Sequence, residues 1–336
     1  MIRIWLIVVG IWIMYLFQQA AWFNDSDSNA KAIANTNTNF DPTRLVFLIS
    51  MGEQAKESKI VERFVWSARH RGQWNGYILL LTDAPTSRYS GSGDGYDNTV
   101  SNNKLVVMNP EPKDLDMRFK ADMPYKRFKT MVIDYTNKDK RLDKVELIYY
   151  LDVDNIVGNS LPNMFDDLES KYNIPSTNRN SNSNSNNNAK WLRTIPRMWF
   201  FANKYTHLSV QGGQFVVSRY SSGACLKAWR DTIDANVSEP KDQPALHKIR
   251  GNGRNQECQI VTMLPKSHLF FPANSTIHRA VEQIKGGKVM VYPTLVHFKN
   301  SCNVTASIDT KVEELYVKDL VGNEEFSKKI HVQPDR

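Results

Sequence analysis

Apolar and polar residues follow one another along the chain in blocks that predict a β-α-β order. Residues 44–50 (RLVFLIS) and 77–81 (YILLL) are short apolar runs followed by turn residues, and they predict buried strands. Between them, residues 53–69 carry apolar side chains three and four positions apart, which is the spacing of a helix with one buried face. Because strands that alternate with helices pair in parallel, we expect an α/β fold with a mostly parallel sheet and helices on both faces.

The same periodicities extend this pattern to the end of the chain. Further strands are predicted at residues 104–108, 146–153, 213–218, 269–271 and 295–297. Further helices are predicted at residues 125–135, 160–168 and 221–233. Residues 177–189 are dominated by Asn and Ser and have no means of burying themselves, so they predict a disordered surface insertion.

The N-terminal residues 4–23 form an uncharged and mostly apolar stretch, IWLIVVGIWIMYLFQQAAWF. About 20 such residues cross a bilayer as a helix, and the positive charge of Arg3 favours a lumenal location for everything that follows. The stretch therefore predicts a transmembrane signal anchor, with a cleaved signal peptide as the alternative. Both interpretations place the chain in the secretory pathway.

The expected organisation is that of a single-pass type II protein of the Golgi or ER membrane with a lumenal folded domain. The predicted cytoplasmic tail, anchor, flexible stem, folded domain and C-terminal extension span residues 1–3, 4–23, 24–42, 43–305 and 306–336. Four Asn-x-Ser/Thr sequons agree with a lumenal domain, at Asn24, Asn236, Asn274 and Asn303.

Composition and charge narrow the class of protein. Hydrophobic residues make up 41% of the 336 residues, enough for a buried core, so wholesale disorder is excluded. A count of 43 Lys and Arg against 35 Asp and Glu gives a net charge of +8, which favours an anionic partner. The basic residues are scattered without a block of five, so we expect no nucleic acid. Three Cys exclude a disulfide framework but leave room for one pair.

The most specific chemical feature is a pair of carboxylates, Asp152 and Asp154, at the end of the apolar run 146–151 (ELIYYL). Residues two apart in a strand point to the same face, so we expect both carboxylates to converge. Two like charges beside a buried strand need a counter-charge, which a hard divalent cation such as Mn²⁺ or Mg²⁺ supplies. The alternative is a surface turn that happens to carry two acids.

This stretch, Tyr149–Val157 (YYLDVDNIV), resembles the Asp-x-Asp motif of nucleotide-sugar glycosyltransferases with the GT-A fold. Other segments resemble, in the same chain order, motifs of the glycogenin-like, retaining branch of that family. They are the opening β-α-β unit over 45–83 and the segments Phe128–Val132, Gln211–Val217, Asp242–Leu246 and Leu295–Phe298. The resemblance implies a GT-A fold over residues 43–305, reached after the N-terminal transmembrane helix.

The resemblance also implies roles for nine residues. The implied metal ligands are Asp152, Asp154 and His297. The implied contacts to the donor are Lys129, Asp152, Gly212 and Gly213 and, at its phosphates, Lys299 in place of the Gly and Lys-Pro-Trp end that the family has and this chain lacks. The implied catalytic residues at the sugar are Asp242 and Gln243.

The function implied is metal-dependent transfer of a hexose from a nucleoside-diphosphate sugar, a UDP-sugar above all, to a glycan or protein acceptor. Gln211 stands where the family has Asn, and the sequence after His297 departs from the family pattern. A GT-A-like protein that binds nucleotide or glycan without catalysis is therefore the alternative. A metal-dependent nucleotidyltransferase ranks last, because only Gly52 stands where a glycine-rich phosphate loop would be needed.

Overall fold

A computed structural model describes the chain in ranges that together make one compact unit within Phe40–Arg336. The described residues are 41–52, 55, 59–89, 104–115, 124–175, 196–202, 210–235, 242–251, 258–264, 268–270 and 294–297. The predicted tail and anchor, the stem up to residue 40, the insertion at 177–189, the extension at 306–336 and the four sequons lie outside them. Within these ranges, no helix combines the length and the apolar character that a membrane crossing requires.

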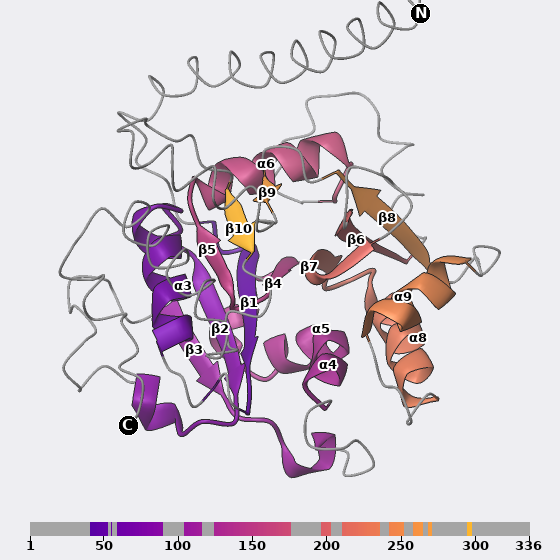
Figure 1. Ribbon diagram of the computed structural model, residues 1–336, viewed down its shortest axis with the longest axis horizontal. Coiled ribbons are helices and arrows are strands. Elements are labelled where there is room, and N and C mark those ends of the chain that lie inside the picture. The colour runs from indigo at the N-terminus through magenta and orange to yellow at the C-terminus, as the bar shows by residue number, and fades with distance from the viewer. Residues whose placement is uncertain are drawn as a thin grey trace, which may run out of the picture. The chain divides into compact units, whose positions relative to one another are not determined.

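A seven-stranded sheet forms the centre of the described unit, in the order β3-β2-β1-β4-β7-β6-β8 (Figure 1). The strands are β1 (Arg44–Ser50), β2 (Tyr77–Thr82), β3 (Leu105–Met108), β4 (Leu147–Leu151), β6 (Arg197–Ala202), β7 (Val210–Ser218) and β8 (Gln259–Met263). β1 pairs in parallel with β2 and β4, as do β2 with β3 and β6 with β8. β7 runs antiparallel to both β4 and β6. The prediction of a mixed α/β fold with a mostly parallel sheet is confirmed.

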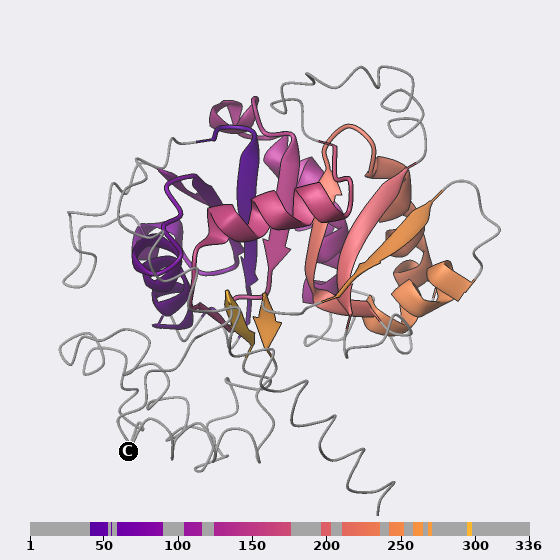
Figure 2. The ribbon, with the colours of Figure 1, turned by 90° about the horizontal axis from the view of Figure 1, so that it is seen from above.

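Helices cover both faces of this sheet, as predicted. One hydrophobic cluster joins β1, β2 and β4 to α3 (Lys59–His70) and α6 (Leu161–Lys171). The cluster on the other face includes α5 (Val132–Thr136), α8 (Gly223–Asp234) and α9 (Asp242–Gly251). Figure 2 shows α6 crossing its face of the sheet. The shorter helical elements are η2 (Thr86–Tyr89), η4 (Pro112–Asp114), α4 (Pro124–Phe128), η5 (Lys129–Met131) and η6 (Lys140–Leu142).

A small second sheet contains β5 (Asn155–Val157), the strand that follows β4 in the sequence. It has the order β5-β10-β9, with β10 (Leu295–His297) and β9 (Leu269–Phe270). β10 runs antiparallel to β5, and the register places the His297 backbone opposite Asn155. The predicted strands near 269 and 295 are therefore confirmed, and they join residues that are more than a hundred positions apart.

Three local predictions differ from the structure. The strand predicted at 146–153 ends at Leu151, because Asn155 donates its backbone N–H (3.1 Å) and its side-chain amide (2.5 Å) to the Asp152 carbonyl and closes a turn. The helix predicted at 125–135 is divided into α4, η5 and α5, with the tighter 3₁₀ turn at Lys129. β5, β6 and β8 were not predicted.

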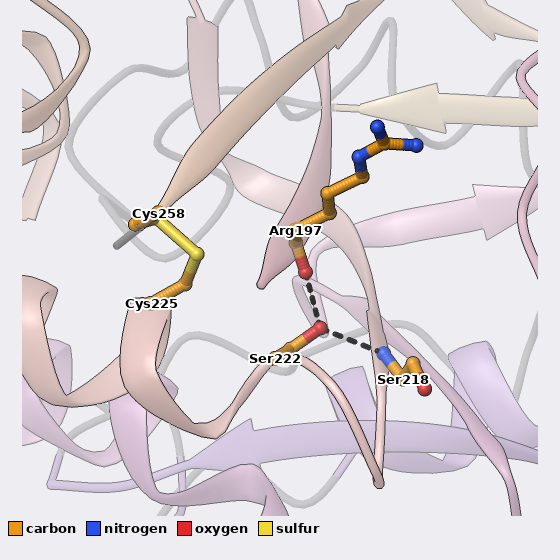
Figure 3. Close-up of a disulfide and its surroundings, with 5 residues drawn as sticks. All are labelled: Arg197, Ser218, Ser222, Cys225 and Cys258. Atoms are coloured by element: carbon orange, nitrogen blue, oxygen red, sulfur yellow. Dashed lines mark hydrogen bonds between the residues drawn. A yellow bond between two sulfur atoms is a disulfide. The ribbon is translucent and has the colours of Figure 1, made fainter. Parts of the chain in front are cut away.

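The one cysteine pair that the sequence allowed is formed by Cys225 and Cys258 (Figure 3). It links the first turn of α8 to the residue before β8, over a sequence separation of 33 residues. Beside it, Ser222 precedes α8 and accepts a hydrogen bond from the Ser218 N–H (2.9 Å), while its hydroxyl donates to the Arg197 carbonyl. In the chain-entropy model, a cross-link of this span stabilises the fold by about 4 kcal/mol. The disulfide thus closes a loop of the chain that contains α9.

Candidate functional site

The candidate site lies where β4 ends beside the beginning of β7. Asp152, the residue after β4, donates its backbone N–H to the carbonyl of Gly213 in β7 (2.8 Å). β4 runs parallel to β1, so Asp152 stands at the carboxyl end of the parallel strands, where ligands bind in open α/β sheets. The structure therefore places the first acid of the Asp-x-Asp motif where a ligand site is expected.

Lys129 is the centre of a charge cluster at this point. Its ammonium donates to the Gly212 carbonyl (3.0 Å) and to Asp242 Oδ2 (3.0 Å), and it lies 3.2 Å from Asp152 Oδ1. These are three acceptors, as many as an ammonium group has hydrogens. The Lys129 side chain is only 12% exposed. It thus joins two carboxylates that are 90 residues apart in the sequence into one partly buried group.

The two glycines of β7 make room for these carboxylates. A Cβ on Gly213 would lie 2.3 Å from Asp152 Oδ2, a distance at which the carboxylate would have to move. A Cβ on Gly212 would lie 3.0 Å from Asp242 Oδ2, which is tight but closer to tolerable. Sequence reasoning expected the glycines to admit a ligand; in the structure, the space above them is taken by the chain's own Asp side chains.

Asp242 begins α9 and is fixed from several directions. Its Oδ1 accepts a hydrogen bond from the Gln243 N–H (2.9 Å), and its carbonyl accepts one from the indole N–H of Trp229 in α8 (3.0 Å). Lys126 Nζ lies 3.7 Å from Asp242 Oδ1 and is more exposed than Lys129. The Gln243 side chain donates to the Val210 carbonyl (3.1 Å). Asp242 therefore lies at the junction of α8, α9 and β7.

Tyr150 lies beneath the cluster and was not predicted as a site residue. Its hydroxyl donates to Asp152 Oδ1 (2.7 Å), and its ring centre is 5.2 Å from Lys129 Nζ. Burial, and then the neighbouring Asp152, Asp242 and Asp154, raise the pKa of the Tyr150 hydroxyl well above its ordinary value, so it stays protonated. The predicted convergence of Asp152 and Asp154 on one strand face does not apply as stated, because β4 ends at Leu151 and both acids lie in the turn that follows it.

The charges within the cluster stabilise one another. Burial alone would lower the pKa of Lys129, but Asp152 and Asp242 outweigh it and the pKa is raised, so Lys129 is charged at neutral pH. Burial would raise the pKa of Asp242, but Lys129 and Lys126 outweigh it and the pKa is lowered. Lys129 and Asp242 are therefore both ionised under physiological conditions.

A layer of buried amides supports the turn that carries Asp152 and Asp154. Asn155 holds the Asp152 carbonyl, and its own Oδ1 accepts from the amide of Gln214 (3.2 Å). Both amide side chains are fully buried. The His297 backbone pairs with Asn155, which brings β10 next to this turn. The third predicted metal ligand is thereby placed near the other two by its backbone alone.

The donor set has the chemistry of a hard-cation site but is small. Asp152 and Asp154 offer carboxylate oxygens, which Mn²⁺ and Mg²⁺ prefer. Among the described residues, no group of three or more His, Cys, Asp or Glu side chains is arranged to hold a metal ion. The side chain of His297 and the whole of Lys299 lie outside the description.

Most of the predicted site residues come together in the structure. Those that meet in or beside the Lys129 cluster are Lys129, Asp152, Asp154, Gly212, Gly213, Asp242 and Gln243. Sequence reasoning missed Tyr150 and Lys126. Tyr150 stands two residues before Asp152 in an apolar strand, and this spacing was the signal that could have revealed it, because residues two apart share a face.

Comparisons with known proteins give only distant structural likenesses. No protein-family model matches the sequence, and no curated protein matches it either. The galactosyltransferase LgtC in complex with donor and acceptor sugar analogs is similar with a TM-score of 0.49 and 10% identity over 87% of this chain and 98% of that one. An active-site mutant of LgtC gives 0.47 and 9%, over 81% and 95%. The glycosyltransferase GlyE of Streptococcus pneumoniae TIGR4 gives 0.49 and 14%, over 86% of this chain but only 65% of that one. These neighbours are glycosyltransferases, but likenesses with TM-scores below 0.5 do not assign an activity.

Proposed function

We propose that the chain is a metal-dependent glycosyltransferase of the GT-A fold that moves a sugar from a nucleoside-diphosphate sugar to a glycan or protein acceptor. The observation that carries the proposal is the Lys129 cluster. It gathers Asp152 and Asp242 with Gly212 and Gly213 at the carboxyl end of β4. These residues come from separate motifs of the resemblance, and they meet although nothing local in the sequence requires it.

The charge of the cluster suits a cationic cofactor. Asp152, Asp154 and Asp242 carry three negative charges, against the positive charges of Lys129 and Lys126. Asp152 and Asp154, with His297 as the third ligand, would hold Mn²⁺ or Mg²⁺. When bound, such a cation stabilises the negative charge that develops on a departing diphosphate.

The chain's own residues have separate tasks in this proposal. Lys129 holds the carboxylates of Asp152 and Asp242 at fixed positions, so that they meet the donor without reorganising. Asp242 and Gln243 face the transferred sugar, and Lys299 contributes positive charge at the phosphates of the donor. We propose retention of anomeric configuration on the resemblance alone.

We further propose a lumenal location in the Golgi or ER, with residues 4–23 as a type II anchor. The Cys225–Cys258 bridge supports an oxidising compartment, because disulfides in ordinary proteins form and persist there. The positive net charge of +8 is consistent with an anionic donor.

A screen of nucleotide-sugar donors tests the proposal. The full-length chain is incubated with each donor and Mn²⁺, with and without glycan acceptors, and released nucleotide is measured against an EDTA-treated sample. We expect EDTA-sensitive release from one or a few UDP-sugars. Turnover that survives EDTA, or an Asp154→Asn variant with full activity, would contradict the metal assignment.

The same screen distinguishes the alternative of a non-catalytic binding protein. Absence of release from every donor, together with calorimetric binding of UDP, would replace the enzyme by a GT-A-like nucleotide-binding protein. Absence of both nucleotide release and UDP binding would contradict any nucleotide-binding function.

A further inference from the structure

Two neighbouring tyrosines of β4 hold carboxylates on opposite faces of the sheet. Tyr149 donates to Glu169 Oε1 (2.6 Å) and stacks on Phe165 with ring centres 3.6 Å apart. Tyr150 donates to Asp152 Oδ1 (2.7 Å) and stacks on Phe215 with ring centres 4.7 Å apart. Both tyrosines are 1% exposed. The chain therefore contains a matched pair of buried tyrosine–carboxylate contacts, only one of which lies in the candidate site.

Tyr150 contacts both signs of charge in the site. Its hydroxyl is bonded to Asp152, and the face of its ring lies under the Lys129 ammonium, 5.2 Å away. Lys129 also approaches Asp152 Oδ1, at 3.2 Å, but it divides its three hydrogens among Asp152, Asp242 and Gly212. The Tyr150 hydroxyl bonds only to Asp152 in the contacts that the structure describes, and its ring is buried and stacked on Phe215.

The orientation of Asp152 follows from these contacts. With Oδ1 held by Tyr150 and Lys129, Oδ2 is turned over Gly213, within 2.3 Å of where a Cβ would stand there. The Asp152 side chain is 23% exposed, more than Lys129 or Asp242, so it is the acid of the cluster that has most access to solvent. Without a fixed Oδ1, its carboxylate would be able to rotate about the Cβ–Cγ bond.

We propose that Tyr150 is a positioning residue of the donor site: its hydroxyl fixes the rotation of the Asp152 carboxylate, and its ring holds the Lys129 ammonium beside it. This inference rests on the proposed function, because the proposed function is what assigns a ligand to Asp152. Tyr150 touches no ligand itself and acts through Asp152 and Lys129. Preorganised polar groups of this kind bind and stabilise charge without reorganising, which is why loss of one hydroxyl has a measurable effect.

The test compares Tyr150→Phe with Tyr149→Phe in the full-length chain. Each variant removes one buried hydroxyl from a carboxylate and keeps a ring stacked on a phenylalanine, so the two lose similar stability. Binding of UDP in the presence of Mn²⁺ is measured by calorimetry, and binding of Mn²⁺ alone by electron paramagnetic resonance. We expect Tyr150→Phe to weaken UDP binding about tenfold to a hundredfold, as for loss of a hydrogen bond to a charged group, and Tyr149→Phe to leave it within about twofold.

A double-mutant cycle with Asp152→Asn separates positioning from general damage to the fold. If Tyr150 acts through Asp152, Tyr150→Phe has little further effect on UDP binding once residue 152 is an asparagine. Equal effects of Tyr150→Phe in both backgrounds, or equal effects of the two tyrosine variants, would overturn the inference. If the wild-type chain binds neither UDP nor Mn²⁺, the proposed function fails and the positioning role fails with it; if the wild type binds and Tyr150→Phe binds equally well, only the positioning role fails.

Discussion

The two tyrosine–carboxylate clusters of β4 contain the same types of residue but differ in how far their acids are exposed to solvent. On one face, Glu169 is 1% exposed and accepts from Tyr149 and from Arg44, whose Nη2 lies 2.8 Å from Oε2. On the other face, Lys129 serves Asp152 and Asp242 together. Arg44 also contacts the more exposed Asp41 (3.4 Å) and Asp166 (2.5 Å), so the first cluster contains one deeply buried acid, Glu169. The second contains Asp152, 23% exposed, and the more buried Asp242, with Lys129 between them and Lys126 beside Asp242.

The difference separates a structural cluster from a binding cluster. In the first cluster, Glu169 is 1% exposed and is held by both Tyr149 and Arg44, so its carboxylate is out of reach of a ligand from solvent. In the second cluster, Asp152 is 23% exposed at the end of a strand, so its carboxylate is accessible to a cation or a polar ligand. The exposure of the acid, 1% for Glu169 and 23% for Asp152, distinguishes the two clusters, and not the residue types.

The largest expected effect is on stability, when each cluster loses its cation. We expect Lys129→Met and Arg44→Met each to lower the free energy of unfolding by about 3–5 kcal/mol, because a buried acid is left without its partner. Chemical denaturation at neutral pH measures this loss.

Second substitutions then distinguish the clusters. Adding Glu169→Gln to Arg44→Met removes both buried charges, so most of the stability should return. Adding Asp242→Asn to Lys129→Met still leaves the Asp152 carboxylate without the Lys129 ammonium, so only part of the stability should return. Full recovery in the Lys129→Met/Asp242→Asn variant would show that Asp152 does not depend on Lys129.

A smaller effect is expected from the two glycines of β7. Gly213→Ala places a Cβ 2.3 Å from Asp152 Oδ2 and forces the carboxylate away. We expect a loss of about 1–3 kcal/mol, as for other steric insertions into packed regions. Gly212→Ala meets Asp242 Oδ2 only at 3.0 Å and should cost less. Urea denaturation of the two variants provides the measurement, and equal losses would contradict the described placement of Asp152.

The sequence predicted the parallel half of the sheet well, because each strand is a self-contained apolar run. Arg44–Ser50 and Tyr77–Thr82 match the predicted strands almost residue for residue. The strand at Arg197–Ala202 is also an apolar run, MWFFA after Arg197, and this signal was overlooked. β8 has mostly half-buried residues, so its pattern is weaker.

The candidate site was predictable in part for a similar reason. Asp152 and Asp154 stand beside an apolar strand, where two acids are conspicuous. The contact between Lys129 and Asp242 spans 113 residues and depends on how α9 packs on β7, so no local pattern announces it. The resemblance placed both residues in the site, but it did not say that they bind one another.

The smallest expected effect is the pH dependence of stability that Asp242 contributes. Its pKa in the folded chain is lowered from 3.8 by Lys129 and Lys126, against the opposing effect of burial. Because the pKa of Asp242 is lower in the folded chain, the ionised carboxylate stabilises the fold at pH values above its ordinary pKa. This stabilisation is lost as the pH falls through the lowered pKa of the folded chain. The stability difference between wild type and Asp242→Asn should therefore be constant from pH 7 to about pH 5 and shrink below about pH 4. Urea midpoints across this range measure it, and a difference that grows towards low pH would contradict the sign.

The central claim is that the Lys129 cluster is the nucleotide-sugar site. The most direct test is to measure donor turnover by the Asp152→Asn and Glu169→Gln variants at equal concentrations of folded protein. Each variant neutralises one carboxylate that accepts a hydrogen bond from a tyrosine of β4. We predict that Asp152→Asn lowers turnover of the accepted donor about 10²- to 10³-fold, as for loss of a preorganised electrostatic group, whereas Glu169→Gln leaves it near the wild-type value. Equal turnover by the two variants would contradict the account.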